Sequence, residues 1–282
     1  MLSQIFINAP YDLLVSKYLP FFLEKRINPE IYFDAEILDK FPKDEFEALA
    51  KELHQHQIKI TFHAPYVDLA PGAIDHKIRQ VTEERLRQLF DLVPIFKPVL
   101  IVAHAAYDEV IYETHEEQWL NSSITTWNHL LPLAERFKVL ITLENVFEPN
   151  PKTLIELFKH LKSHYLGFCF DIGHQHAFTK TKISDWLTLF PYLKQVHLHD
   201  NHGLKDEHLG LGKGNIDFAY FFRLLIKHKI LPLITLEPHT EQAFWDSLDY
   251  LDKLPKDIKR FFKKRADWRI SRPRGGRKEV IA

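Results

Sequence analysis

The 282-residue chain has little cysteine and no long hydrophobic run, and these absences exclude several classes of protein. Its one cysteine, Cys169, excludes an internal disulfide framework and is compatible with a reducing cytoplasm. No run reaches the roughly eighteen apolar residues of a membrane helix, so we expect neither a membrane span nor a membrane partner. The first residues lack a basic region and a small-residue cleavage site, so we expect no signal peptide and a cytoplasmic location.

A strong net charge is also absent, but the charges are unevenly distributed. The formal net charge is −1, and from Lys253 to the end twelve basic residues stand against three acidic ones. That local net of +9 leaves −10 for the rest of the chain, which is unsuited to binding a nucleic-acid duplex. We expect a folded domain over residues 1–254 and a mobile basic C-terminal tail over residues 255–282.

Short apolar runs alternate with amphipathic segments along the folded part. The expected strands are residues 4–7, 30–33, 58–62, 99–103, 139–143, 166–170, 195–198 and 233–236. The expected helices are a first one interrupted by Pro20, then residues 44–56, 75–90, 116–137, one beginning near Pro151, and residues 183–190, 218–228 and 241–251. Eight such units predict an α/β fold, a closed (β/α)8 TIM barrel in a single domain.

The strongest functional signal lies where the seventh strand ends. The run QVHLHDN (residues 195–201) leads into a loop that carries further histidines and aspartates, including Asp206 and His208. Imidazole and carboxylate groups together are the ligands of a divalent cation. A strand end that opens into such a loop is where a barrel enzyme places its chemistry.

The same design recurs at the ends of six consecutive strands. Their first polar residues are His63, His104, Glu144, Asp171, His197 and Glu237. Strand ends of a barrel converge on one face, so we expect these side chains to meet in one pocket, together with His174, Asp206 and His208. Glu144, Asp171, His197 and Glu237 alone form a site suited to Mn²⁺, Mg²⁺, Co²⁺ or Zn²⁺. The five remaining ligands leave room for a second or third ion.

Several of these stretches resemble the xylose-isomerase-like barrel superfamily, which includes sugar (phosphate) isomerases and epimerases and endonuclease-IV-type AP endonucleases. The motifs are FHAPY (62–66), LEN (143–145), FDIGH (170–174), VHLHD (196–200), DEH (206–208) with GKGNID (212–217), and LEP (236–238). The resemblance covers roughly residues 63–237. It is specific for the superfamily and leaves the reaction open.

Similarity to the keto-sugar epimerases implies an isomerase or epimerase that acts on a sugar or sugar phosphate through an enediolate. Glu144 and Glu237 would be metal ligands and also the acid/base pair, and Asp171 and His197 would complete the site. We expect substrate contacts from His174, Tyr66, His199 and Lys213. The sequence departs from many such epimerases in the loop over residues 201–210, which contains no arginine.

Similarity to the endonuclease-IV-type enzymes implies a different reaction, zinc-dependent cleavage of DNA at abasic sites. Those enzymes bind three zincs with nine ligands, which the nine residues above match type for type, and Tyr66 matches a tyrosine that lies near their DNA. The acidic body argues against this alternative, as does the segment NVFEP (145–149), which replaces a glycine-rich stretch. A barrel that binds metal or small ligands without turnover is a third possibility. The charge distribution favours sugar chemistry, and the oligomeric state stays open.

Overall fold

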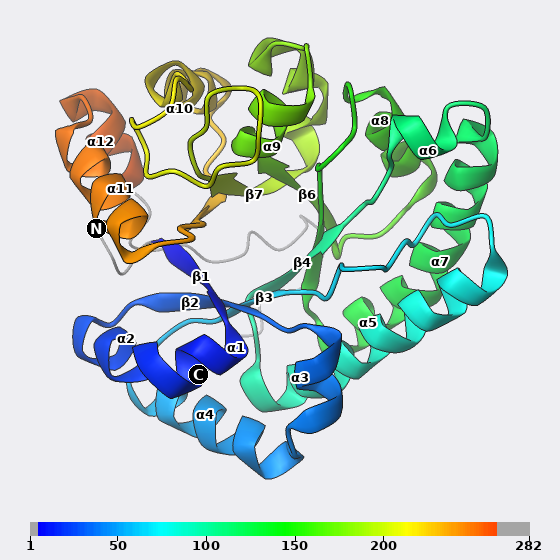
Figure 1. The fold of residues 1–282 in the computed structure, drawn as a ribbon, viewed down its shortest axis with the longest axis horizontal. Helices are drawn as coiled ribbons and strands as arrows, with labels where there is room; N and C mark the ends of the chain where they lie inside the picture. The colour runs from blue at the N-terminus through cyan, green and yellow to red at the C-terminus, as the bar shows by residue number, and fades with distance from the viewer. Residues whose placement is uncertain (1–4, 264–282) are drawn as a thin grey trace, which may run out of the picture.

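The structure, a computed structural model, describes residues 5–263, which form a closed ring of parallel strands surrounded by helices (Figure 1). The strands are β1 (Phe6–Pro10), β2 (Asn28–Tyr32), β3 (Thr61–His63), β4 (Leu100–His104), β5 (Leu140–Glu144), β6 (Leu166–Asp171), β7 (Leu193–Leu198) and β8 (Leu233–Leu236). Neighbours in the chain pair in parallel, and β8 pairs with β1. The predicted single-domain (β/α)8 TIM barrel is confirmed.

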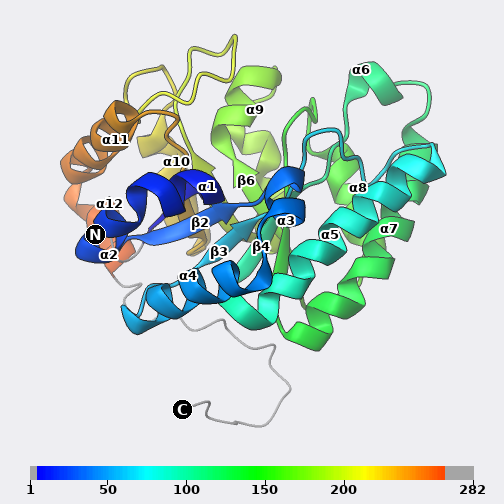
Figure 2. The same cartoon turned by 60° about the horizontal axis from the view of Figure 1, so that its bottom comes forward.

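Helices follow the strands and cover the outside of the ring. They are α1 (Tyr11–Leu13), the π-helical turn η2 (Leu14–Tyr18), α2 (Leu19–Lys25), α3 (Ala35–Lys40), α4 (Lys43–Gln55), α5 (His76–Phe96), α6 (Glu109–Tyr112), α7 (Glu116–Phe137), α8 (Lys152–His160), α9 (Ile172–Phe178), the 3₁₀ helix η3 (Ile183–Tyr192), α10 (Phe218–His228), α11 (Glu241–Lys253) and α12 (Lys256–Lys263). Figure 2 shows the loop between β7 and α10 at the same end of the barrel as α9. No helix within residues 5–263 is long and apolar enough to cross a membrane.

The strands are buried on both faces, which explains their nearly continuous apolar sequences. Between strands and helices lies a large apolar layer, in which Phe33 and Phe62 make an edge-to-face contact at 4.9 Å. A smaller apolar cluster, which includes Phe6, Val102 and Cys169, fills the inside of the barrel. Cys169 is a free, buried thiol. The barrel is therefore packed, and its chemistry is confined to one end.

Strand register brings the polar residues at the strand ends to one level. His104 on β4 is aligned with Glu144 on β5, and Asp171 on β6 is aligned with His197 on β7. These pairs lie at the carboxyl ends of the strands, the face where TIM barrels place their active sites. The predicted convergence of the strand ends is therefore observed.

The sequence placed the first three strands imperfectly. Instead of residues 4–7, 30–33 and 58–62, the strands are Phe6–Pro10, Asn28–Tyr32 and Thr61–His63. Ile58 and Ile60 are buried but precede β3, so the apolar run begins before the strand does. The predicted interruption at Pro20 is observed, because the π-helical turn η2 ends at Tyr18 and α2 begins at Leu19. Pro20 lies in the first turn of α2, where no backbone N–H is required.

The segment predicted as a basic tail also needs a correction. Lys256–Lys263 form helix α12, which packs against α10, and the side chain of Ile258 is fully buried. An isoleucine at this position lets a strongly charged helix cover the core with one face. Residues 264–282, which hold most of the predicted tail, lie outside the described residues. The domain boundary at residue 254 stays a prediction.

Candidate metal centre

A cavity of about 1020 Å³ opens at the carboxyl ends of the strands. Seven of the nine predicted ligands line it: His63, His104, Glu144, His174, Asp206, His208 and Glu237. The other two, Asp171 and His197, are fully buried beside them. All nine predicted ligands are thus brought together in one place.

Four ligands form a compact group at the base of the cavity. One ligand atom from each of Glu144, Asp171, His197 and Glu237 lies within 4.8 Å of all the others. The Nδ1 atom of His197 is central, at 3.3 Å from Oε1 of Glu144 and 3.1 Å from Oε1 of Glu237. We call this set the core group. Its three carboxylates and one imidazole suit a divalent cation.

A second group shares Glu144 with the core group. The Nε2 atoms of His63 and His104 lie 3.3 and 3.6 Å from Oε2 of Glu144. The Nδ1–H of His63 donates to the carbonyl oxygen of Ala64 at 3.0 Å, which leaves Nε2 as the free ligand atom. Tyr66 stacks on His104 with ring centroids 4.3 Å apart, so it lies at this side of the cavity.

A third group contains His174, His199, Asp206 and His208, and we call it the loop group. Oδ2 of Asp206 lies 3.0 Å from Nε2 of His208 and 3.3 Å from Nε2 of His174. The other ring nitrogens of these histidines donate to backbone carbonyls, of Glu237 and Asn145 respectively. His199 was predicted as a substrate contact, but it is buried and its ligand atom belongs to this group.

Asp200 holds the loop that carries Asp206 and His208. This buried carboxylate accepts backbone hydrogen bonds from four N–H groups, those of Asn201, Gly212, Gly214 and Ile216. Gly214 is required by space, because an added Cβ would clash with the carbonyl oxygen of Asn201. One carboxylate therefore fixes both ends of a loop that contains no regular helix or strand.

Glu30 is a buried acidic residue that the sequence interpretation missed. It lies on β2 inside the barrel, with Oε1 3.0 Å from Nε2 of His197. Its other oxygen accepts hydrogen bonds from Thr61, Gln195 and Thr235. A carboxylate beside the second ring nitrogen of a metal-ligating histidine fixes its orientation and raises its basicity. The signal in the sequence that could have identified it is a glutamate within an otherwise apolar strand.

The charges of the site are mutually stabilising. Burial alone would raise the pKa of Glu144, but the neighbouring His197 holds it well below its usual range. Burial would also raise the pKa of Glu237, but the neighbouring His197 lowers it. Burial would lower the pKa of His197, but the surrounding acidic groups raise it well above its usual value. The cluster therefore keeps its carboxylates ionised and favours a positive charge between them.

Unsatisfied atoms show that the site fits a cation. Among the described residues, both oxygens of Glu144, Nδ1 of His197 and Oδ1 of Asp206 are buried without a hydrogen-bond partner. Oε1 of Glu144 and Nδ1 of His197 lie 3.3 Å apart but are not aligned for a hydrogen bond. Buried groups of this kind are costly unless something satisfies them. Burial also lowers the pKa of His104 to about 3, so this ligand is neutral and able to bind a metal at neutral pH.

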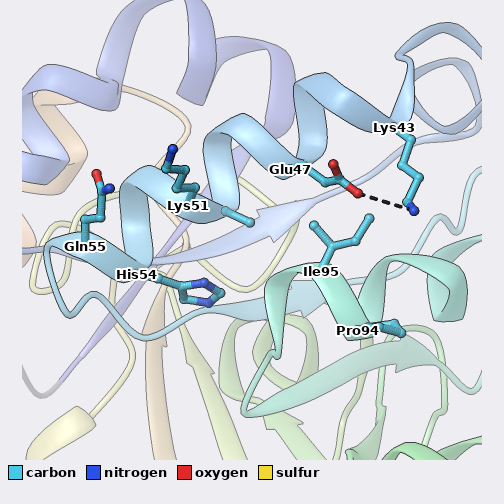
Figure 3. A pocket seen from close by; sticks show the side chains of 8 residues that line it. Lys43, Glu47, Lys51, His54, Gln55, Pro94 and Ile95 are labelled. Carbon is cyan, nitrogen blue, oxygen red and sulfur yellow. Dashed lines mark ion pairs between the residues drawn. The ribbon is translucent and has the colours of Figure 1, made fainter.

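Lys213 is the one predicted site residue that the structure places elsewhere. Its Nζ lies 3.3 Å from Oδ1 of Asp246 on α11, and the side chain does not line the cavity. A separate hollow of about 670 Å³ lies between α4 and α5, where Figure 3 shows Lys51, His54 and Ile95 along its walls. Lys43 and Glu47 form an ion pair at its edge, at 3.3 Å. It contains none of the predicted ligands.

The model of the xylose isomerase-like TIM barrel family matches residues 30–261 of this sequence. The chain belongs to this family. The match includes Glu30 and every predicted metal ligand, and it confirms the superfamily predicted from the motifs. The family match therefore covers most of the barrel together with the residues of the ligand groups.

A relative matches part of the chain, and solved structures share its fold. MJ1311 of Methanocaldococcus jannaschii is 30% identical over 176 residues, which are 58% of this chain and 59% of that protein, so the match spans about three fifths of the relative's length. A D-tagatose 3-epimerase-like protein superposes with a TM-score of 0.77 at 22% identity, covering 93% of this chain and 99% of that one. The TTHB071 protein of Thermus thermophilus, soaked with ZnCl₂, gives 0.73 at 23% identity, covering 90% and 98%. At these identities the two structures show a shared fold.

Proposed function

We propose that the protein is a divalent-metal-dependent isomerase or epimerase that acts on a sugar, with Glu144 and Glu237 as its acid/base pair. One observation carries the proposal. The two carboxylates flank the same ring nitrogen of His197, at 3.3 and 3.1 Å, and both line the cavity. A sugar that reaches the base of the cavity therefore meets a carboxylate from β5 and another from the end of β8.

The proposed reaction needs a proton carrier on each side of the reacting carbon. One glutamate takes the proton from the carbon that bears a hydroxyl group, and the C–H electron pair moves toward the adjacent carbonyl to give an enediolate. For an epimer, the other glutamate, which holds a proton from solvent, protonates the opposite face of the same carbon, and the first glutamate releases its proton to solvent. For an isomer, the proton is added to the former carbonyl carbon, while the proton of the hydroxyl group moves to the former carbonyl oxygen. No oxidant or reductant is consumed.

The metal ligands have a separate role in this proposal. Held by the core group, a divalent cation would polarise the substrate carbonyl and stabilise the charge that develops on its oxygen. Asp171 and His197 are fully buried and cannot reach substrate, so we assign them to metal binding alone. Membership of the xylose isomerase-like family supports the proposal, as does the fold shared with the D-tagatose 3-epimerase-like protein.

A zinc-dependent phosphodiester hydrolase of the AP endonuclease type is the second candidate. The observation in its favour is the presence of the second group and the loop group beside the core group, since several ions can activate water and neutralise a phosphate. Against it stands the lining of the cavity. Lys17 is the one lysine or arginine among the described lining residues, and its Nζ lies 2.7 Å from Oε1 of Glu241. A DNA-binding face needs many free cations.

The variant His208→Ala separates the two candidates, because His208 belongs to the loop group and not to the core group. For the isomerase, we expect the core metal to stay bound and substrate binding to weaken by roughly 1–3 kcal/mol. For the hydrolase, we expect a metal equivalent to be lost together with nicking of an abasic-site duplex. His129→Ala is the matched control, since His129 is an exposed histidine on α7 that neither lines the cavity nor belongs to a ligand group. Metal analysis with assays on keto-sugars and on the duplex gives the answer.

A further inference from the structure

The cavity above the metal ligands has two apolar walls. Phe147 and Phe178 contact each other with ring centroids 4.8 Å apart, and both line the cavity although they are 47% and 37% exposed. We call this pair the first wall. Phe21 and Trp245 contact each other at 6.0 Å and also line the cavity, with Trp245 50% exposed. This pair is the second wall.

The two walls lie on opposite sides of the opening. Phe147 and Phe178 follow β5 and β6, whereas Phe21 and Trp245 lie in α2 and α11, which follow β1 and β8. In a closed ring of eight strands, β1 is opposite β5. Figure 1 shows α2 and α11 on one side of the barrel and α8, which follows β5, on the other. A ligand above the metal ligands therefore has aromatic rings on two sides.

The size and charge of the cavity restrict what can fill it. Its volume of about 1020 Å³ is at the upper end of the roughly 300–1,000 Å³ range for drug-sized ligands, so one sugar ring leaves most of it empty. Lys17, the one lysine or arginine among the described lining residues, is already paired with Glu241 at 2.7 Å and contacts the hydroxyl of Tyr18 at 3.1 Å. A phosphate on the sugar would find no unpaired lysine or arginine among these described residues.

We infer that the substrate is an uncharged sugar that carries an aromatic or similarly flat apolar substituent. The sugar hydroxyls face the ligand groups at the base, and the substituent lies between the first and second walls. Exposed aromatic side chains that gather around a polar site mark a binding surface, and ring-to-ring contacts add to the free energy gained from burial. The inference rests on the proposed function and names the substrate class for the same site.

Binding of matched glycosides to the metal-loaded protein tests this inference without turnover. The probes are phenyl and methyl β-D-glucopyranoside, which differ in the aromatic group, and D-glucose 6-phosphate. We expect the phenyl glucoside to bind at least about tenfold more tightly than the methyl glucoside, since an aromatic contact contributes on the order of one factor of ten. We expect the phosphate to bind no more tightly than the methyl glucoside. Titration calorimetry gives all three affinities.

Variants in each wall decide whether the aromatic side chains cause the preference. Trp245→Ala and Phe178→Ala should each reduce the phenyl preference several-fold while leaving the melting temperature and metal content close to those of the wild type. Tyr220→Ala is the control, because Tyr220 is an exposed aromatic residue outside the cavity lining. Equal affinity for both glucosides, no binding of the phenyl glucoside, tighter binding of the phosphate, or a preference that survives in both variants would overturn the inference. Failure of proton exchange with keto-sugars would instead contradict the proposed function.

Discussion

The Oε1 atom of Glu30 lies 3.0 Å from Nε2 of His197, inside the barrel and on the side of the imidazole away from the core group. Nδ1 of the same ring faces Glu144 and Glu237. The carboxylate of Glu30 beside Nε2 keeps the proton on that nitrogen and leaves Nδ1 free to bind a cation. Glu30 is therefore a positioning residue that acts through His197.

Replacing Glu30 should weaken metal binding without removing a ligand. We expect Glu30→Gln to lower the affinity of the core group for a divalent cation by roughly 10–100-fold. A loss of this size is typical when the residue that orients a metal-ligating histidine is replaced. Competition with a chelator measures the affinity, and Glu47→Gln on the outer surface of α4 is the control. An unchanged affinity in Glu30→Gln would show that the contact does not tune the site.

Asp200 should stabilise the loop group specifically. Asp200→Ala leaves four backbone N–H groups without their acceptor, so we expect a loss of at least about 2 kcal/mol in the free energy of unfolding. Because Asp200 holds the loop that carries His208, substrate binding should weaken while the core group keeps its ion. Denaturant unfolding, substrate titration and metal analysis measure these effects. Loss of the core ion in Asp200→Ala would contradict a local role for Asp200.

Glu148 should make stability depend on pH. Burial raises the pKa of this carboxyl from 4.5 to about 7, against the hydrogen bonds that it accepts from Val146 and Tyr107. Between these two pH values the unfolded chain releases the proton that the folded chain keeps, so the stability contribution of Glu148 falls as pH rises. The full change amounts to about 3 kcal/mol.

The comparison with Glu148→Gln isolates this group from other titrations, because the amide does not ionise. From pH 4.5 to pH 7.5 the variant should gain stability relative to the wild type, as measured by denaturant unfolding at each pH. A difference between the two proteins that stays constant with pH would refute the assigned cause.

Ile258 tests whether α12 belongs to the folded domain. The side chain is fully buried, so Ile258→Ala should cost about 2–4 kcal/mol of unfolding free energy. Lys256→Ala, at an exposed position of the same helix, should cost less than about 0.5 kcal/mol. If both variants are equally stable, residues 255–263 behave as the tail that the sequence suggested.

The sequence revealed the barrel and the predicted ligands for a physical reason. Parallel strands covered on both faces must be apolar throughout, so the first polar residue after each run marks the functional end of the barrel. His63, His104, Glu144, Asp171 and Glu237 were all found by this rule. The rule uses only the order of residues along the chain, and the closed barrel then brings the strand ends together.

What the sequence did not reveal depends on contacts between distant strands. Glu30 is paired with His197, which lies 167 residues further along the chain, and no local pattern predicts that contact. The walls of the cavity likewise combine α2 with α11, and the β5–α8 loop with α9. Lys213 was misplaced because Asp246, its partner, comes from a helix far along the chain. Helix α12 was not predicted, because its basic residues outnumber the one isoleucine that anchors it.

Proton exchange in heavy water tests the central claim most directly. Keto-sugars, including D-fructose and D-tagatose, would be incubated in D₂O with the wild-type protein loaded with Mn²⁺, Mg²⁺, Co²⁺ or Zn²⁺, and carbon-bound deuterium would be followed by mass spectrometry. We predict deuterium at the carbon next to the carbonyl of at least one sugar, and a loss of at least about a hundredfold in Glu144→Gln and in Glu237→Gln. No exchange with any sugar by the metal-loaded wild type, together with nicking of an abasic-site duplex, would contradict the account.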